Sequence, residues 1–224
     1  GRIFVASFFG ERCLSRSKSS RTDQTFTFAF FSLSTMTAYP AKLLLFGEHT
    51  VNAGSQALAV PLPLFSGKWV YAPHLSPVEL AARQMQLPQL ADYLHQLQQR
   101  GELLADLDVA AFKQALDNGL VFESNIPTGY GAGSSGALVA GIFGNWKLEN
   151  WNIGSSSLLQ LKQALAQMEA FFHGTSSGTD PLICYLQKPV VLGGPQGVEV
   201  IQASNSGQLE SAGYRFFLLD TGMP

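Results

Sequence analysis

The stretch IPTGYGAGSSGALVAGIF, residues 126–143, decides the fold, because a loop of glycine and serine leads directly into a run of small apolar residues. Glycine permits positive φ angles and lets the backbone approach a ligand closely. The N-terminal end of a helix carries unpaired N–H groups and attracts anions. The pattern therefore predicts a helix over about residues 134–147. The loop before this helix has several possible functions.

One interpretation of this loop is a phosphate site. Backbone N–H groups of Gly129 to Ser135 would surround phosphate oxygens, and the hydroxyl of Ser134 or Ser135 would bind Mg²⁺. The common phosphate loop G-x-x-x-x-G-K-[ST] is absent and the loop holds no lysine, so a cation must come from another segment. The plain alternative is a glycine-rich turn without a ligand.

Two further alternatives rest on short motifs. Residues 131–136 fit the G-x-G-x-x-G pattern of NAD-dependent oxidoreductases, and Glu149 lies near the expected acidic position, but NIPTGY separates the motif from the preceding strand. Residues 174–178, GTSSG, fit the G-x-S-x-G pattern of acyl-transfer nucleophiles. That motif needs a strand before it and a helix after it, and here the predicted order is reversed.

The composition excludes several classes of protein. The 224 residues are 46% hydrophobic and 13% charged with a net charge of -2, which suits one or two globular domains. No basic stripe indicates a nucleic-acid partner, and no apolar run reaches the roughly 18 residues of a membrane-spanning helix. Cys13 and Cys184 form neither a disulfide framework nor a zinc motif, so a reducing, cytoplasmic location is expected.

Both ends of the sequence differ from the rest. Residues 1–35 are basic and lack periodicity; we interpret them as a non-native or disordered leader before Met36, with a transit peptide as the alternative. The closing residues RFFLLDTGMP, 215–224, read as an apolar strand and a turn, where a chain rarely stops, so the sequence is expected to be cut short.

Hydrophobic periodicity between these ends predicts an α+β fold without strict βαβ alternation. Helices are expected over residues 76–101 (broken near Pro88), 108–118 and 155–174, the last with serine N-cap candidates. Strands are expected at 41–50, 56–73 (interrupted by prolines), 119–127, 181–193 and 197–202.

A second cluster, MEAFFHGTSSGTD at residues 168–180, carries two carboxylates. Glu169 and His173 are four residues apart and share a helix face. Glu169 interrupts an apolar face, which costs free energy unless the carboxylate is solvated or paired, for example with Mg²⁺. Taken alone, Glu169 is equally well a solvated side chain at a helix end, and Asp180 an Asx-turn residue before Pro181.

Three segments together resemble the GHMP kinases. PTGYGAGSSGA (127–137) is similar to the family's phosphate loop P-x-G-x-G-L-G-S-S-A, with Ala132 and Gly136 as small changes. AKLLLFGEHTVNAGSQALAVPL (41–62) resembles the opening P-G-K-x-x-L-x-G-E-H-x-V-x-x-G of the mevalonate kinase branch. Residues 169–180 resemble its pattern E-x-x-x-H-G-x-P-S-G-x-D.

The resemblance covers about residues 40–224, the N-terminal two-thirds of such a kinase. It implies an α+β GHMP kinase N-terminal domain (ribosomal protein S5 domain 2-like), with the C-terminal ferredoxin-like domain largely missing. The implied domains are a leader at 1–35, an ATP-binding domain at 36–212 and the start of a truncated C-terminal domain at 213–224.

The implied activity is ATP-dependent phosphorylation of a small-molecule hydroxyl with Mg²⁺, most simply of mevalonate to phosphomevalonate. Alternatives within the resemblance are a phosphomevalonate or sugar kinase, or a non-catalytic relative that binds a nucleotide or metabolite. The expected partner is a small-molecule substrate, with no nucleic acid and no membrane. The oligomeric state is open, with a homodimer as one alternative.

The resemblance also implies roles for individual residues. Asp180 would be the general base and Lys42 would contact it and keep it ionised, while Ser135 and Glu169 would bind the metal ion. Glu48 and His49 would contact the substrate. The implied nucleotide-binding residues are Ser124, Gly129, Tyr130, Gly131, Ala132, Gly133, Ser134 and Ser135.

Overall fold

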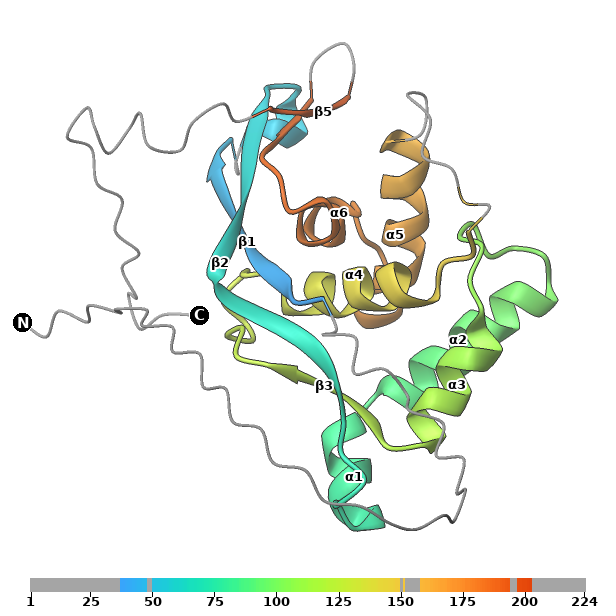
Figure 1. Cartoon of the computed structure of the whole chain (residues 1–224). Helices are drawn as coiled ribbons and strands as arrows, with labels where there is room; N and C mark the ends of the chain where they lie inside the picture. The colour runs from blue at the N-terminus through green and yellow to red at the C-terminus, as the bar shows by residue number, and fades with distance from the viewer. Residues whose placement is uncertain (1–36, 48–49, 150, 152–157, 194–196, 203–224) are drawn as a thin grey trace, which may run out of the picture. The chain divides into compact units, whose positions relative to one another are not determined.

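One long strand organises the sheet of this protein. The computed structural model describes residues 37–47, 50–149, 151, 158–193 and 197–202 (Figure 1). Strand β2 (Ala57–Tyr71) pairs with β1 (Tyr39–Phe46) along one edge. Its first residues pair with β4 (Val190–Leu192) and its last with β3 (Leu120–Ser124), while β5 (Val198–Val200) pairs with β4. Every pairing among the described strands is antiparallel, unlike the parallel sheet of a dinucleotide-binding domain.

The expectation that prolines interrupt residues 56–73 is wrong, because β2 runs unbroken through Pro61 and Pro63. Both prolines fall between the part of β2 that pairs with β4 and the part that pairs with β3. Lys42, opposite Pro61, donates its backbone N–H to Ala132 and not to β2. The nitrogen of Pro61 therefore points to the stretch of edge where no described strand pairs, and its missing N–H costs no ladder hydrogen bond.

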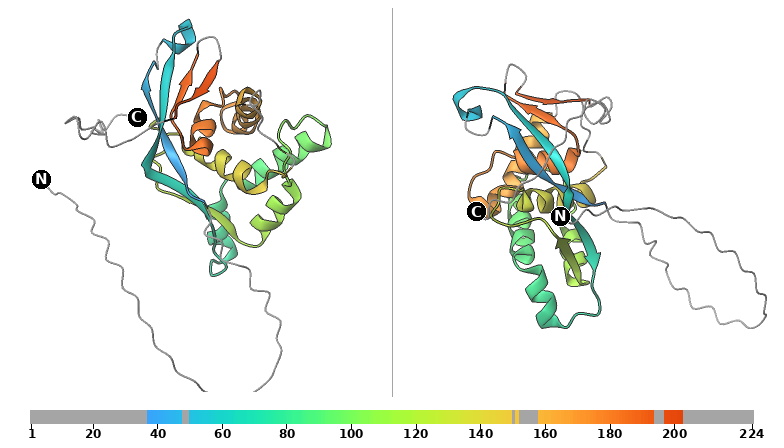
Figure 2. Two further views of the ribbon diagram at one scale, coloured as in Figure 1. Left: turned by 45° about the horizontal axis from the view of Figure 1, so that its top comes forward. Right: turned by 90° about the vertical axis from the view of Figure 1, so that its left-hand side faces the viewer.

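The helices lie on one face of this sheet (Figures 1 and 2). Helix α4 (Ser134–Trp146) and helix α6 (Thr179–Leu186) contact both β1 and β2, and α5 (Leu158–His173) packs on them. The remaining elements are α1 (Pro77–Gln84), α2 (Leu87–Gln99), α3 (Val109–Asp117) and the short 3₁₀ turn η1 (Val51–Ala53). In the described part of the chain no helix is long and apolar enough to cross a bilayer.

The core joins the sheet to the helices through large side chains. Trp69 of β2 stacks edge-on against Phe112 of α3, Phe122 of β3 and Trp146 of α4. Phe143 and Leu165, on α4 and α5, are completely buried. This packing fixes α4 against the sheet, and α4 in turn fixes the glycine-rich loop at its N-terminal end.

The predicted strand at 181–193 is wrong over its first half, because residues 179–186 form helix α6 and only 190–192 form a strand. Gly178, with φ +70°, precedes the helix, and Asp180 and Pro181 lie in its first turn, where an acid and a proline are both tolerated. Leu182, Ile183 and Cys184 are consecutive and completely buried. Such a run cannot be assigned to helix or strand from periodicity alone.

The other predicted elements agree with the structure. Residues 76–101 divide into α1 and α2 at Met85 and Gln86, so Pro88 lies in the first turn of α2. The helices expected at 108–118, 134–147 and 155–174 correspond to α3, α4 and α5, and the mixed α+β class is confirmed. The serine N-cap candidates of α5, the leader at 1–35 and the segment 213–224 lie outside the described residues.

Candidate active site

The glycine-rich loop connects β3 to α4 and requires its glycines. Gly129, Gly131 and Gly133 all have positive φ angles, which side-chain-bearing residues rarely adopt. A Cβ on Gly133 would lie 2.9 Å from Cγ of Lys42, so the loop also approaches β1 closely. The carbonyl of Ala132 accepts the backbone N–H of Lys42 at 3.0 Å, which fixes the loop to the edge of β1.

The loop presents its backbone to solvent at the N-terminal end of α4. Gly129, Tyr130 and Gly131 are exposed, and Gly133 caps the helix without a side-chain hydrogen bond. The first N–H groups of a helix have no intrahelical acceptor and carry a positive partial charge. The geometry therefore suits an anion, with Ser134 and Ser135 in the first turn.

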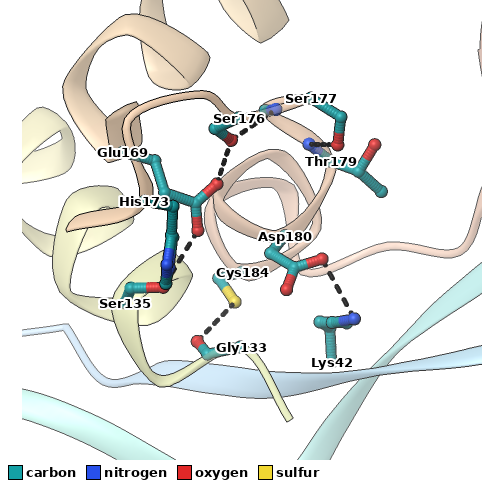
Figure 3. Close-up of polar contacts among 11 residues, drawn as sticks. Lys42, Gly133, Ser135, Glu169, His173, Ser176, Ser177, Thr179, Asp180 and Cys184 are labelled. Carbon is teal, nitrogen blue, oxygen red and sulfur yellow. Dashed lines mark hydrogen bonds and ion pairs between the residues drawn. The ribbon is translucent and has the colours of Figure 1, made fainter. Parts of the chain in front are cut away.

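Lys42 and Asp180 form an ion pair beside this loop (Figure 3). Nζ of Lys42, on β1, lies 3.0 Å from Oδ1 of Asp180, in the first turn of α6. The two side chains are 12% and 30% exposed, so the ammonium is shielded while the carboxylate remains accessible. The cation absent from the loop thus comes from a neighbouring strand.

Gly136 lets α4 and α6 come together at this pair. A Cβ on Gly136 would lie 2.8 Å from both Cβ and the carbonyl carbon of Asp180. The family pattern has alanine here, a difference that appeared small in the sequence. In this chain a methyl group at Gly136 would overlap Asp180 unless the backbone shifted.

Glu169, on α5, is the buried carboxylate of the site, with only 5% of its surface exposed. Its Oε1 accepts the hydroxyl of Ser135 at 3.1 Å, and its Oε2 accepts the hydroxyl of Ser176. Burial raises the pKa of Glu169, the hydroxyl of Ser176 lowers it, and the negative charge of Asp180 raises it again. Within the described residues no lysine or arginine forms an ion pair with this carboxylate.

Two further side chains support the cluster. Nε2 of His173 lies 3.1 Å from Oγ of Ser135. Because Glu169 and His173 are four residues apart on α5, both side chains contact the hydroxyl of Ser135. The buried thiol of Cys184 donates weakly to the carbonyl of Gly133. Burial raises the pKa of Cys184 far above its usual range, so the thiol stays neutral.

A cavity of about 480 Å³ opens next to the glycine-rich loop. It lies between the α1–α2 junction, β3, the start of α4 and the end of α5. Its lining includes Arg83, Gln86, Ser124, Thr128, Ser135 and His173. The contribution of the α1–α2 junction was missed from the sequence, because those residues belong to no motif.

The structure brings most of the predicted site residues together. Lys42, Ser135, Glu169 and Asp180 come from four different elements and meet beside Gly133 (Figure 3). Ser124, Ser134 and Ser135 line the cavity, whereas Gly129 to Gly131 form the exposed part of the loop. Glu48 and His49, the predicted substrate contacts, lie outside the described residues.

The G-x-S-x-G alternative does not fit its surroundings. Residues 174–178 connect helix α5 to helix α6, without the strand that must precede such a nucleophile. The hydroxyl of Ser176, the central serine, bonds to the carboxylate of Glu169 and not to a histidine. This serine is therefore a hydrogen-bond donor within the cluster.

The oxygen ligands that this site offers would hold Mg²⁺ only together with phosphate oxygens. The described residues contain no group of three His, Cys, Asp or Glu side chains that could hold a metal ion alone. Glu169 supplies one carboxylate and Ser135 one hydroxyl, at the end of a helix that attracts anions. Mg²⁺ commonly binds one or two carboxylates plus the phosphates of a substrate and keeps several waters.

Residues 83–188 match the family model described as GHMP kinases N terminal domain. The resemblance to the GHMP kinases is thereby confirmed over these residues. The match spans α2 to α6 and includes the glycine-rich loop, Glu169 and Asp180.

Curated relatives come from the mevalonate kinases. The mevalonate kinase of Thermococcus onnurineus (strain NA1) is 28% identical over 163 residues, 64% of this chain and 47% of the relative. That of Thermococcus gammatolerans (strain DSM 15229 / JCM 11827 / EJ3) is 27% identical over 168 residues, with the same coverage. The chain spans about half the length of the curated relatives it matches.

Solved structures of mevalonate kinases also align with the chain. The Methanococcus jannaschii mevalonate kinase aligns with a TM-score of 0.44 at 18% identity, over 75% of this chain and 56% of that one. The mevalonate kinase of methicillin-resistant Staphylococcus aureus MRSA252 aligns with a TM-score of 0.40 at 18% identity, over 74% and 54%.

Proposed function

We propose that this protein is a kinase that transfers the γ-phosphoryl group of ATP to a hydroxyl group of a small molecule. One observation carries the proposal: two carboxylates, a lysine and a serine hydroxyl converge from four elements at the N-terminal end of α4. Phosphoryl transfer needs positioning, charge neutralisation and removal of a proton. The arrangement offers a residue for each of these tasks.

The nucleotide is held by the glycine-rich loop and the cavity beside it. Backbone N–H groups of Gly129 to Ser135 bind the phosphates, since they lead into a helix that favours negative charge. The cavity of about 480 Å³ accepts the nucleoside, with Ser124 in its wall. Hydroxyls of Ser134 and Ser135 lie where the loop meets the cavity.

Glu169 and Ser135 would hold Mg²⁺ through a carboxylate and a hydroxyl oxygen. When bound, the metal ion neutralises the charge of the phosphoryl groups. The carboxylate of Glu169 is buried among hydroxyl groups and lacks a cationic side chain among its described partners. A bound cation would relieve the free-energy cost of that burial.

Asp180 accepts the proton of the substrate hydroxyl as that oxygen attacks. Its carboxylate is accessible, whereas Lys42 is shielded beside it at 3.0 Å. The ammonium group of Lys42 orients the carboxylate and stabilises negative charge as it develops on the transferred group. The short distance from Gly133 to both side chains keeps this pair next to the phosphate loop.

Mevalonate is the substrate we propose, because the named relatives are mevalonate kinases and the opening motif at residues 41–62 resembles that branch. The roles of Glu48 and His49 as substrate contacts stay predictions, as do the cytoplasmic location and the homodimer. A phosphomevalonate kinase, a sugar kinase and a non-catalytic nucleotide-binding relative are the alternatives. Phosphomevalonate, as an acceptor that already carries a phosphate, would need more lysine and arginine side chains near the site than Lys42 and Arg83 supply.

The test is detection of the phosphorylated product by mass spectrometry. The 224-residue chain is incubated with Mg-ATP and, separately, mevalonate, phosphomevalonate or galactose, beside the variant Asp180→Asn. Phosphomevalonate from the wild type alone would support the proposal. A parallel calorimetric titration compares ATP with NAD: ATP binding without any product would favour the non-catalytic relative, and no ATP binding would refute the proposed site.

A further inference from the structure

We propose that Ser176 is a positioning residue that links the metal-binding carboxylate Glu169 to the start of α6, which carries the catalytic base. The inference rests on the proposed function of this site. The family pattern E-x-x-x-H-G-x-P-S-G-x-D has proline at the position that Ser176 occupies here. A hydroxyl group therefore stands where the pattern has no polar side chain.

The first half of the link fixes Glu169. The hydroxyl of Ser176 donates to Oε2, and the hydroxyl of Ser135 donates to Oε1 at 3.1 Å (Figure 3). With both oxygens held, the carboxylate has one orientation, and each oxygen keeps a free lone pair for a cation. Without Ser176, Oε2 would be a buried acceptor that loses its hydroxyl donor.

The second half of the link fixes α6. Oγ of Ser176 accepts the backbone N–H of Gly178 at 2.9 Å, and Gly178 is the N-cap of the helix that carries Asp180 in its first turn. A Cβ on Gly178 would overlap the carbonyl oxygen of Lys162, so this turn packs closely against α5. The turn has little room to shift, and one hydroxyl contacts both Glu169 and the start of α6.

The neighbouring serine provides a matched control. Oγ of Ser177 accepts the N–H of Thr179 at 3.3 Å, and no hydrogen bond joins it to Glu169 among the described contacts. Ser177→Ala thus removes a hydroxyl from the same loop without touching the carboxylate. Ser176→Thr keeps the hydroxyl, whereas Ser176→Ala and Ser176→Pro both remove it.

The experiment measures Mn²⁺ binding to the full chain by electron paramagnetic resonance, in the presence of ADP. We expect Ser176→Ala to weaken Mn²⁺ binding on the order of ten- to 100-fold, the usual effect of losing a hydrogen bond that orients a metal ligand. Ser176→Thr should restore binding, and Ser177→Ala should bind like the wild type. Circular dichroism of each variant establishes that the helices remain folded.

Equal Mn²⁺ affinity of Ser176→Ala and Ser177→Ala would overturn the inference while leaving the proposed metal site intact. Absence of Mn²⁺ binding in the wild type would instead refute that metal site. If Ser176→Ala fails to fold, Ser176→Pro decides, because the family pattern carries proline in this loop. Wild-type affinity in Ser176→Pro would show that the hydroxyl is dispensable and would overturn the inference.

Discussion

The two carboxylates of the candidate site are held in opposite ways. Glu169 is 5% exposed and accepts hydrogen bonds from the neutral hydroxyls of Ser135 and Ser176. The side chain of Asp180 is 30% exposed and pairs with the ammonium group of Lys42 at 3.0 Å. One negative charge is thus buried without a cationic side chain among its described partners, and the other is balanced and accessible.

This contrast separates two chemical tasks. A buried carboxylate without a counter-charge costs free energy, and binding of a metal ion would remove that cost. An accessible carboxylate beside a fixed ammonium can receive a proton from a substrate hydroxyl. Environment therefore divides the proposed roles between Glu169 and Asp180, although both are carboxylic acids.

The largest effect should come from Asp180→Asn, which removes the proposed proton acceptor and keeps the size of the side chain. We expect turnover of the proposed kinase reaction to fall by roughly 10²- to 10⁴-fold, the usual contribution of general acid–base catalysis. Affinity for Mg-ATP, measured by calorimetry, should change little, because Asp180 is assigned no contact with the nucleotide. An equal loss of turnover in Asp92→Asn, an exposed carboxylate on α2, would contradict the division of roles.

Much of the site could be predicted because its residues lie in compact motifs. The glycine-rich loop, the helix after it and the cluster at residues 168–180 are each local in sequence, and their backbone requirements are visible in glycine spacing. Lys42 lies far from them in the chain, and only the resemblance to the GHMP kinases connected it with Asp180. The structure places these side chains 3.0 Å apart.

The rest depends on tertiary contacts that no local pattern records. Helix α6 was mistaken for a strand because four consecutive residues, Pro181 to Cys184, are all buried and show no helical periodicity. The continuity of β2 through Pro61 depends on where β3 and β4 pair with it. The link through Ser176 and the close packing at Gly136 require knowledge of which atoms meet across α4, α5 and α6.

Gly136→Ala should disturb one of the two carboxylates, Asp180, directly. The new Cβ would lie 2.8 Å from the Cβ and carbonyl carbon of Asp180, and these atoms belong to a packed helix that cannot easily move. Overpacking of this kind costs about 1–3 kcal/mol, of which the better helix propensity of alanine restores about 1 kcal/mol. Urea denaturation and turnover should both show a loss.

Gly144→Ala is the matched control for that substitution, on the same helix. Its new Cβ would meet the hydroxyl end of the Tyr39 side chain, away from Asp180. Stability should fall here too, but turnover at a temperature where the protein is folded should not. Equal turnover losses in the two variants would show that the packing at Gly136 has no special effect on Asp180.

Glu169→Gln should stabilise the folded protein at neutral pH but impair metal binding. Burial raises the pKa of Glu169, so the folded protein binds this proton more tightly than the unfolded chain does. The resulting stabilisation is full below the unfolded pKa of about 4.3 and is lost as pH rises through the folded pKa. Glutamine removes this dependence, and we expect a gain of about 0.5–2 kcal/mol at neutral pH, together with loss of Mn²⁺ binding.

Urea denaturation over a series of pH values measures this effect. The difference in unfolding free energy between wild type and Glu169→Gln should grow as pH rises from the acidic range to neutrality. Glu199→Gln, at an exposed position on β5, is the matched control for the loss of one carboxylate. A wild type that gains stability relative to Glu169→Gln on the same rise in pH would mean that the buried carboxylate is stabilised in its charged form.

The smallest effect should come from an ion pair that is shorter than the one at the site. Nζ of Lys113 on α3 lies 2.6 Å from Oδ1 of Asp92 on α2, with the two side chains 41% and 59% exposed. Exposed pairs of this kind contribute only about 0–1 kcal/mol, since water and salt screen them. A double-mutant cycle with Lys113→Met and Asp92→Asn, repeated at low and high salt, should give a weak coupling that fades with salt. The same cycle on Lys42 and Asp180, where the lysine is shielded, should give a stronger coupling that is less sensitive to salt. Equal couplings would mean that the shielding of Lys42 does not strengthen its ion pair with Asp180.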